Sequence, residues 1–358
     1  MSEKTKKAFH PGYYIKEYLE DIQMTQDEFA KRVGISGKQI SLIIKESASI
    51  TPDIAFKLSK LMGTSIEMWL NLQTKYDSYK IQQESLSAYE EEKEIYKMID
   101  KDFLINLKII DSKDDIDTAI SKLRQASFVS SLTLHKTNDI FCFYRISNNK
   151  NDNINNTVCR NVWVSIASSI AKKDDVKPFD EKKLLENIGT FRSMTTNNPC
   201  VFYPKLKKIL NDSGVSFVVL PSLKNSNING VVKWIDSQKV MMALNTRGSY
   251  NDRFWFSFFH ELKHVLQKSK RKTLISQEVI SEFEEVSLEY EADYFAKESL
   301  IPSSELDKLL AYDENSVIEF ANKINIHPGI VVGRLQKEQK IKYSQLNHLK
   351  EKYEIIIN

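Results

Sequence analysis

Two histidines and a glutamate form the pattern H-E-x-x-H within FWFSFFHELKHVLQ, as His260, Glu261 and His264. This stretch contains no glycine or proline and repeats apolar residues at helical spacing, which predicts a largely buried helix. Residues four apart lie on one face of a helix, so the two imidazoles can bind a single zinc ion (Zn²⁺). Glu261 would point in a different direction, toward a water molecule beside that ion.

A second helix-like stretch, EEVSLEYEADYFAKESLIP at 284–302, contains acidic residues that could complete the site. A catalytic zinc ion commonly has three protein ligands and an open fourth position, and Glu289 could be the third ligand. Asp293, one turn later, could accept the N–H of a ligating imidazole and thereby fix its tautomer. Glu291 points to another face and is a weaker candidate. The alternative is a pair of hydrogen-bonded core histidines without metal, and the second acidic element favours zinc over it.

These residues resemble those of the ImmA/IrrE metallopeptidases, in which H-E-x-x-H is followed by a helix of the form E-x-E-A-[ND]-x-F-A. Here that helix reads EYEADYFAKESLIP, and the resemblance extends over residues 215–302. It implies a thermolysin-like, zincin-like zinc endopeptidase whose ligands are His260, His264 and Glu289. Glu261 would be its general base. Relatives of this type cleave helix-turn-helix repressors, so the resemblance also implies a regulatory protein as the substrate.

In the implied mechanism a zinc ion acidifies water and polarises the scissile carbonyl, while Glu261 accepts the water proton and passes it to the leaving amine. Lys263 occupies a position where the family often has glycine, which leaves the ligands intact but could alter the cleft. Tyr250, Arg247 and Arg253 lie near the motif in the sequence, and we expect structural roles for them.

The segments before the motif predict the elements that hold it. VSFVVLP, INGVVKW and VMMALN, at 215–221, 228–234 and 240–245, are rich in valine and separated by polar residues and glycine. They are typical of antiparallel strands. A substrate could add as an extended strand to the edge of such a sheet, along GVVKW or VMMAL.

The N-terminal part begins with helix-capping signals. Thr25 opens a T-x-x-E capping box, Gly34 suits a left-handed helix end, and Ser36 opens an S-x-x-Q box directly afterwards. Two helices joined by so short a turn are a helix-turn-helix candidate. Further caps at Thr51 and Thr64 predict a compact bundle of about five helices.

The second helix of this pair has a polar side that could face DNA. Ile40, Leu42 and Ile43 or Ile44 would serve the core, and the segment 29–45 contains four basic residues and no acidic one. Such local asymmetry suits a phosphate backbone, although a solvated helical bundle explains the pattern equally well. The candidate DNA contacts are Lys38, Gln39, Ser41 and Lys45.

Residues 10–77 resemble the HigA-like antitoxin branch of the lambda-repressor-type (XRE) helix-turn-helix family. The resemblance is carried by HPGYYIKEYL, MTQDEFAKRVGISGKQISLIIKE and the closing WLNLQTKYD. It implies operator DNA binding, usually by a homodimer, and often repression of a toxin operon. It also implies that Gln26 lies near a phosphate and that Lys38, Gln39 and Ser41 contact the groove.

The middle of the chain contains few functional signals. Residues 78–118 alternate charged and apolar residues at helical spacing, which predicts a helical connector. FCFYRI (141–146) is typical of a strand and NNKNDNINNT (148–157) of an exposed loop. VWVSIASSIAKK is compatible with either a helix or a strand.

The C-terminal segment from Ser316 repeats part of the N-terminal pattern, with E-F-A in register and a second H-P-G tripeptide at 327–329. Its second helix, GIVVGRLQ, is more apolar than the corresponding N-terminal one. This favours a buried helical hairpin that closes the peptidase domain over a second DNA-binding motif. We interpret His327, which precedes a proline, as structural.

Composition narrows the class of protein. The net charge is +3, hydrophobic residues make up 41%, and no apolar run approaches the roughly 18 residues of a membrane helix. The charged N-terminus lacks a signal-peptide core, and three widely spaced cysteines argue against a disulfide framework. We therefore expect a cytoplasmic protein without membrane contact.

Together these features predict an all-α helix-turn-helix domain at 1–77, a connector at 78–118 and an α+β metallopeptidase domain with a small antiparallel sheet at 119–358. The predicted function is a DNA-binding regulator that cleaves a repressor, a toxin or itself in the connector. A non-proteolytic antitoxin or repressor, whose zinc domain binds a toxin or senses a signal, is the alternative. A purely structural domain without metal is the third possibility.

Overall fold

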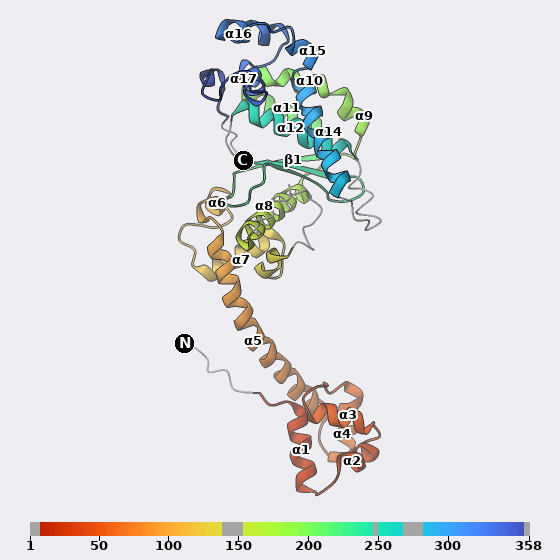
Figure 1. The fold of residues 1–358 in the computed structure, drawn as a ribbon. Helices are drawn as coiled ribbons and strands as arrows, with labels where there is room; N and C mark the ends of the chain where they lie inside the picture. The colour runs from red at the N-terminus through yellow and green to blue at the C-terminus, as the bar shows by residue number, and fades with distance from the viewer. Residues whose placement is uncertain (1–7, 138–152, 246–249, 268–281, 354–358) are drawn as a thin grey trace. The chain divides into compact units, whose positions relative to one another are not determined.

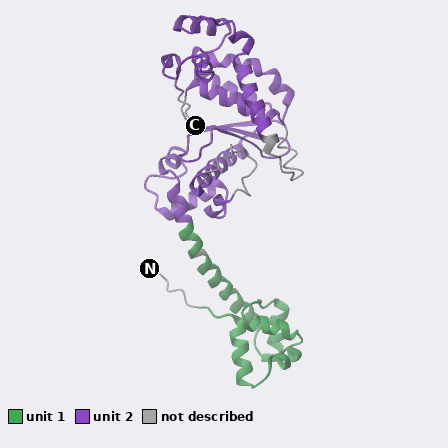
Figure 2. Cartoon of the chain, viewed as in Figure 1, with its two compact units in different colours: residues 1–91 green, residues 92–358 purple. Residues whose placement is uncertain are grey.

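The computed structural model describes residues 8–137, 153–245, 250–267 and 282–353 (Figure 1). The chain forms two compact units, Met1–Glu91 and Glu92–Asn358, and the division falls inside helix α5, Ile66–Met98 (Figure 2). Each unit has a hydrophobic core of its own. The predicted strand at 141–146 lies outside the described residues.

The first unit is the predicted helical bundle. Its core contains the fully buried residues Phe29, Ile40, Leu58 and Trp69. Its helices are α1 (Pro11–Asp21), α2 (Gln26–Val33), α3 (Gly37–Ile44), α4 (Pro52–Met62) and the start of α5.

The predicted caps delimit α2 and α3. Thr25 Oγ1 accepts a hydrogen bond from the backbone N–H of Glu28 at 3.2 Å. Ser36 Oγ accepts one from Gln39 at 3.1 Å. Gly34 ends α2 in the left-handed conformation, with φ of 74°, where a side chain would be strained. Local sequence therefore sets where α2 and α3 begin and where α2 ends.

The prediction that Thr64 caps the next helix is wrong by one residue. Ser65 Oγ accepts the N–H of Met68 at 3.1 Å and so caps α5. Thr64 Oγ1 instead accepts the indole N–H of Trp69 at 2.8 Å. Trp69 is almost fully buried, and this bond satisfies its polar group, which decides which hydroxyl remains for the cap.

The second unit places a small sheet among many helices. Before the sheet come α6 (Lys101–Asn106), α7 (Ile116–Ser127), the 3-10 helix η1 (Leu132–Lys136), α8 (Ile154–Lys173), α9 (Glu181–Glu186), α10 (Ile188–Ser193), η2 (Met194–Thr196) and α11 (Pro199–Asn211). The strands are β1 (Val215–Leu220), β2 (Gly230–Trp234) and β3 (Val240–Asn245). After them come α12 (Asn251–Leu266), α14 (Glu282–Leu300), α15 (Ser303–Leu306), α16 (Glu314–Lys323), α17 (Pro328–Lys337) and η3 (Asn347–Leu349).

The sheet is mixed, and the prediction of a wholly antiparallel sheet is wrong. The strand order is β1-β3-β2, with β2 antiparallel and β1 parallel to β3. Both sides of β3 are therefore paired, so VMMAL cannot accept a substrate strand as predicted. GVVKW, which is β2, lies at an edge of the sheet.

Helices cover both faces of this sheet, with α8 on one side and α11 and α12 on the other (Figure 1). Phe217, Met242 and Val232 are register partners across the three strands and belong to the core that includes α12. On the α8 side, Trp163 donates its indole N–H to the carbonyl of Pro221 at 2.9 Å. Burial on both faces explains the continuous apolar runs of the strands.

The ambiguous segment VWVSIASSIAKK lies in helix α8, which is buried through most of its length. A helix buried on all sides lacks the polar stripe by which periodicity distinguishes a surface helix, so the sequence could not decide. Of the predicted loop at 148–157, residues 148–152 lie outside the described residues, and residues from 154 onward belong to α8, which Asn153 caps.

The C-terminal hairpin of α16 and α17 packs into the second unit, as predicted. His327 accepts the backbone N–H of Gly329 at 3.0 Å and thereby caps α17. His10 caps α1 in the same way through Gly12, also at 3.0 Å. The repeated H-P-G tripeptide is therefore a helix-start motif, and the structural interpretation of His327 is confirmed.

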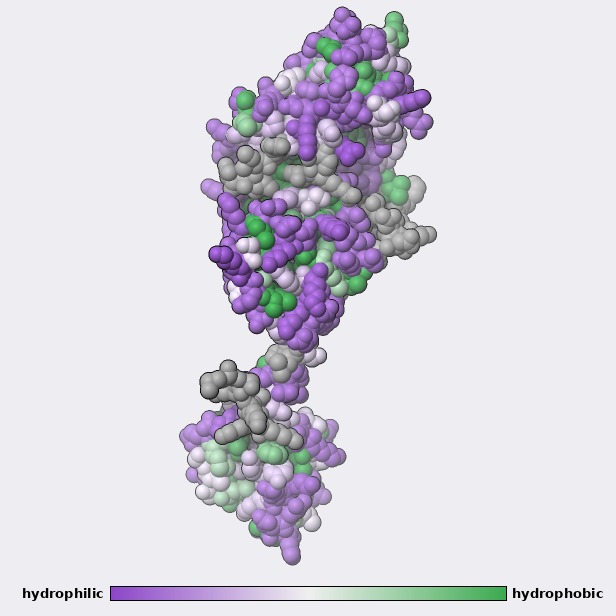
Figure 3. Space-filling view, turned by 90° about the vertical axis from the view of Figure 1, so that its left-hand side faces the viewer, coloured by the Kyte–Doolittle hydropathy of each residue, from purple (hydrophilic) through white to green (hydrophobic). Residues whose placement is uncertain are grey.

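On the face drawn in Figure 3, hydrophilic side chains predominate over the second unit, whereas the first unit shows hydrophilic and hydrophobic side chains mixed. Within the described residues, no helix combines the length and the apolar character needed to cross a membrane.

Candidate metal centre

Helix α12 places both histidines of the H-E-x-x-H motif on one side, facing α14. The side chains of His260 and His264 are 18% and 6% exposed, and their Nε2 atoms lie 3.1 Å apart. The opposite side of α12 packs against the sheet through Phe258, whose ring lies 5.9 Å from that of Phe217. Burial of the apolar side of α12 therefore orients the imidazoles.

Glu289 reaches the same point from α14. Its Oε2 lies 3.3 Å from His260 Nε2 and its Oε1 lies 3.3 Å from His264 Nε2. One potential ligand atom from each of these three residues falls within 4.8 Å of the others. Two imidazoles and a carboxylate are typical zinc donors, so the predicted ligand residues fit a divalent metal ion.

The outer nitrogen of each imidazole has an acceptor of its own. His260 Nδ1 lies 2.8 Å from Asp293 Oδ1, the contact predicted for Asp293. His264 Nδ1 lies 2.8 Å from Gln267 Oε1. Such contacts place the proton on Nδ1 and direct Nε2 toward an ion. Gln267 was not identified from the sequence, although its position three residues after His264 on a helix is a usable signal.

Glu291 and Lys263 lie to one side of this cluster. Glu291 Oε2 contacts Lys263 Nζ at 3.4 Å and accepts from Gln267 Nε2 at 3.3 Å. The lower rank predicted for Glu291 agrees with this placement. Lys263 also lies over the ring of Phe295 and lines a small pocket with Glu291, so its effect on a substrate cleft stays a prediction.

Glu261 is buried, with 8% of its surface exposed, against the start of β2. A Cβ atom added to Gly230 would lie 2.7 Å from Glu261 Oε1 and 2.6 Å from its Cγ. The glycine at this position leaves the space that the carboxylate occupies. The edge strand and the candidate general base are therefore in direct contact.

The pKa values of His260 and Glu289 depend strongly on the charged groups around them. Burial alone would lower the pKa of His260, but its hydrogen bonds to Asp293 and Glu289 outweigh burial and raise the pKa to about 10. Burial alone would raise the pKa of Glu289, but its bonds to His260 and His264 hold the pKa well below its ordinary value. Without an ion, His260 is therefore protonated at neutral pH, and a metal must displace that proton.

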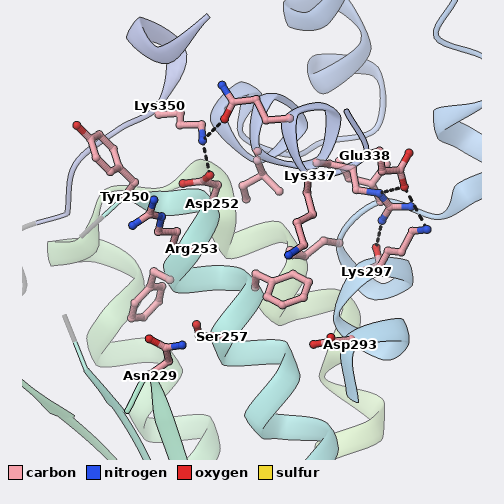
Figure 4. A pocket seen from close by; sticks show the side chains of 18 of the residues that line it. Asn229, Tyr250, Asp252, Arg253, Ser257, Asp293, Lys297, Lys337, Glu338 and Lys350 are labelled. Carbon is pink, nitrogen blue, oxygen red and sulfur yellow. Dashed lines mark hydrogen bonds and ion pairs between the residues drawn. The ribbon is translucent and has the colours of Figure 1, made fainter. Parts of the chain in front are cut away.

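A cleft of 1120 Å³ lies beside this centre along α12, α14 and α17 (Figure 4), and neither the three candidate ligands nor Glu261 belongs to its wall. Asp293, which contacts His260, and Ser257, one turn before Glu261, belong to its wall. Tyr250 and Arg253 also line it, so they border the site in space and not only in sequence. Arg247 lies outside the described residues.

The predicted DNA contacts lie on or beside α2 and α3. Gln26 is the first residue of α2 and is exposed, as are Lys38 and Lys45. Gln39 and Ser41 are half-buried. The structure therefore places these residues on or directly after two consecutive helices, and none of them is fully buried.

One predicted core residue of α3 lies elsewhere. Ile40 and Ile43 are fully buried, but Leu42 is 36% exposed and lies on the solvent side of the helix. Helical spacing explains the difference, because Leu42, two residues after Ile40, points to the opposite side of the helix, whereas Ile43, three residues after it, shares the face of Ile40.

Two known family models match the chain, one in each of its two compact units. The helix-turn-helix family model matches residues 15–69, from α1 to the start of α5. The model of the IrrE N-terminal-like domain, a peptidase family, matches residues 214–348, from just before β1 into η3. Fold and sites thus define a DNA-binding regulator with a metallopeptidase-type domain.

Curated relatives match the first unit. The HTH-type transcriptional regulator YddM of Escherichia coli is 40% identical over 70 residues, which cover 19% of this chain and 74% of YddM. Virulence-associated protein I of Dichelobacter nodosus is 35% identical over 81 residues, or 22% and 75% of the two chains. This chain therefore belongs to the helix-turn-helix transcriptional regulators.

Among solved structures, an addiction module antidote protein of the HigA family from Coxiella burnetii is 33% identical. The match covers 24% of this chain and 95% of that one, with a TM-score of 0.23. Both families expected from the sequence are confirmed.

Proposed function

We propose that this chain is a transcriptional regulator whose second unit is a zinc-dependent endopeptidase that cleaves a regulatory protein, such as a repressor or a toxin. The observation that carries the proposal is the convergence of His260, His264 and Glu289 beside the buried carboxylate of Glu261. The cleft lies beside this centre at Asp293, and a metal centre next to a cleft is a common arrangement in catalytic sites.

When bound, a zinc ion would polarise the scissile carbonyl and make water more acidic. Glu261 would accept the proton of the attacking water and transfer it to the leaving amine. Asp293 and Gln267 would hold His260 and His264 in the required tautomer. Gly230 would keep Glu261 close to the edge strand, where an extended substrate could pair with β2.

We propose a substrate protein in trans. Much of the connector at 78–118, the predicted segment for self-cleavage, is helical, in α5 and in α6. A peptidase of this kind acts on an extended chain, so self-cleavage there would first require a helix to unwind.

The proposed DNA-binding surface comprises Gln26 at the start of α2 and the polar side of α3. Helix N-termini favour phosphate, and lysines on the second helix of the pair suit the groove and the backbone. We propose that Lys38, Gln39 and Ser41 approach base edges and that Lys45 contacts a phosphate. A homodimer would fit the operators that this class binds.

The enzymatic proposal is tested with zinc-loaded wild-type protein and its Glu261→Gln and His264→Ala variants. Candidate repressor and toxin proteins are incubated with each, and the products are mapped by mass spectrometry. We expect cleavage by wild type only, zinc retained by Glu261→Gln, and zinc lost from His264→Ala. Full operator binding and toxin neutralisation by Glu261→Gln, without cleavage by wild type, would support a non-proteolytic antitoxin instead.

A further inference from the structure

The cleft beside the metal centre has more basic than acidic groups in its wall. Its acidic residues are Asp252, Asp293 and Glu338. Its basic residues are Arg253, Lys297, Arg334, Lys337 and Lys350. A cleft with unbalanced positive charge attracts an anionic ligand, provided that its cations are not already neutralised within the protein.

Every one of the acidic residues is already engaged. Asp252 Oδ2 accepts from Lys350 Nζ at 2.6 Å, and both side chains are about one-tenth exposed. Glu338 Oε1 contacts Arg334 Nε at 2.6 Å and also Lys297 Nζ at 3.1 Å (Figure 4). Asp293 contacts His260. These pairs neutralise or share the charge of three of the five cations.

Arg253 and Lys337 are the two basic residues of the cleft wall that remain outside these pairs. Both side chains are exposed, and among the described residues neither has a hydrogen-bond or ion-pair partner. Arg253 lies in the first turn of α12, and Figure 4 shows Lys337 directed from the end of α17 into the cleft. The charge that remains available to a ligand is thus concentrated at two positions on opposing helices.

We propose that this cleft selects a peptide with an acidic side chain, which Arg253 and Lys337 bind. The inference rests on the proposed function and specifies its substrate class. Guanidinium binds a carboxylate through two parallel hydrogen bonds, and the ammonium adds a second attractive charge.

The position of Arg253 predicts how far the acidic residue lies from the cleaved bond. Arg253 precedes His260 by seven residues on α12, or about 10 Å along the helix. An extended chain covers that distance in about three residues. The acidic side chain should therefore lie roughly three residues from the scissile bond.

A nucleic acid is a poorer match for the same surface. A phosphate backbone needs a continuous stripe of free cations, whereas here two free cations alternate with paired ones and with three carboxylates. The wall also borders the proposed peptidase centre at Asp293, which contacts His260. Both observations favour a peptide.

The test measures binding separately from cleavage. The full chain with Glu261→Gln is mixed with fluorescein-labelled neutral peptides of about twelve residues, long enough to span the cleft when extended. A single glutamate is moved through the sequence, and each peptide is paired with its glutamine counterpart. Anisotropy should show one position at which glutamate tightens binding about fivefold or more, as expected for a charge-assisted pair.

Variants assign the preference to the cleft. Arg253→Gln and Lys337→Gln should each reduce it, and their combination should abolish it. Lys205→Gln, which changes an exposed lysine of α11 outside the cleft, should leave it intact. With Arg253→Glu, a lysine peptide should become the preferred ligand. Unchanged zinc content verifies that each variant is folded.

Several outcomes would overturn the proposal. They are equal binding of glutamate and glutamine peptides, no binding of any glutamate peptide, and a preference that survives the double variant. Cleft-dependent binding of a single-stranded oligonucleotide in place of the peptides would also overturn it. A glutamate preference without cleavage by the wild-type protein would instead refute the peptidase function and leave the acidic subsite standing.

Discussion

The carboxylate of Asp293 lies 2.8 Å from Nδ1 of His260, and Glu289, one turn earlier on the same helix, lies 3.3 Å from Nε2 of that imidazole. One helix thus contacts both nitrogens of one histidine. The group that hydrogen-bonds the nitrogen facing away from the metal fixes the tautomer of a ligating imidazole. Asp293 should therefore affect metal affinity without contacting the ion.

Asp293→Ala should weaken zinc binding by about ten- to a hundredfold, the usual effect of removing such a partner. Asp293→Asn, which retains an acceptor, should recover part of the loss. Competition with a chromophoric chelator measures both. Glu298→Gln is the matched control on the same helix, because among the described residues Glu298 contacts Ser303 and Arg334 and no residue of the metal centre. Equal losses in the alanine variant and this control would refute the role of Asp293.

Gln267→Ala should weaken zinc binding less than Asp293→Ala, by about tenfold or less, because its amide oxygen is a neutral acceptor. The amide also donates to the carbonyl of Leu288 at 2.9 Å and so connects the end of α12 to α14. The same chelator competition tests this. Affinity identical to wild type would show that His264 needs no outer partner.

Gly230→Ala should lower the cleavage rate while zinc content stays normal. The added methyl group would displace the Glu261 carboxylate, and a general base contributes about 10²–10⁴ to the rate. Gly189→Ala is the control, since a Cβ there meets no atom within 4 Å. If both variants cleave at the wild-type rate, the contact between Gly230 and Glu261 has no catalytic importance.

Zinc affinity should rise with pH. The pKa of His260 in the metal-free site is raised from 6.5 to about 10, so at neutral pH an ion must displace one proton there. Loss of one proton makes apparent affinity increase about tenfold per pH unit below that pKa. In the metal-free protein, protonated His260 also contributes to the free energy of unfolding. Because its pKa is raised on folding, this contribution is fully present below pH 6.5 and is lost as the pH rises toward 10. Chelator competition between pH 6 and pH 8 and proton release on zinc addition test the affinity trend.

Lys38→Ala should weaken operator binding and reduce the dependence of log K on log salt by about one. Gln39→Ala should weaken binding with little change in that slope, because glutamine is uncharged. Lys16→Ala is the control, since Lys16 is paired with Glu20 on α1 at 3.8 Å. Wild-type affinity in both α3 variants would place the DNA-binding surface elsewhere.

Features that depend on neighbours along the chain could be predicted. The four-residue spacing of His260 and His264, and of Glu289 and Asp293, fixes which side chains share a helix face. The Thr25 and Ser36 caps depend on hydrogen bonds between residues three positions apart, so the sequence locates the starts of α2 and α3 accurately. Thr64 was misassigned because two adjacent hydroxyls compete and a distant requirement, the buried indole of Trp69, decides between them.

The helix-turn-helix, the two helices of the candidate metal centre and the types of donor residue were determined by the sequence alone, because they follow from periodicity and capping. Tertiary structure decided the rest. It decided the parallel pairing of β1 with β3 and the contact of Gly230 with Glu261. It also placed Arg253 and Lys337 in the wall of one cleft. Each of these features brings together residues that are far apart in the chain. Local preferences do not encode such contacts, since they arise only when helices and strands pack around a common core.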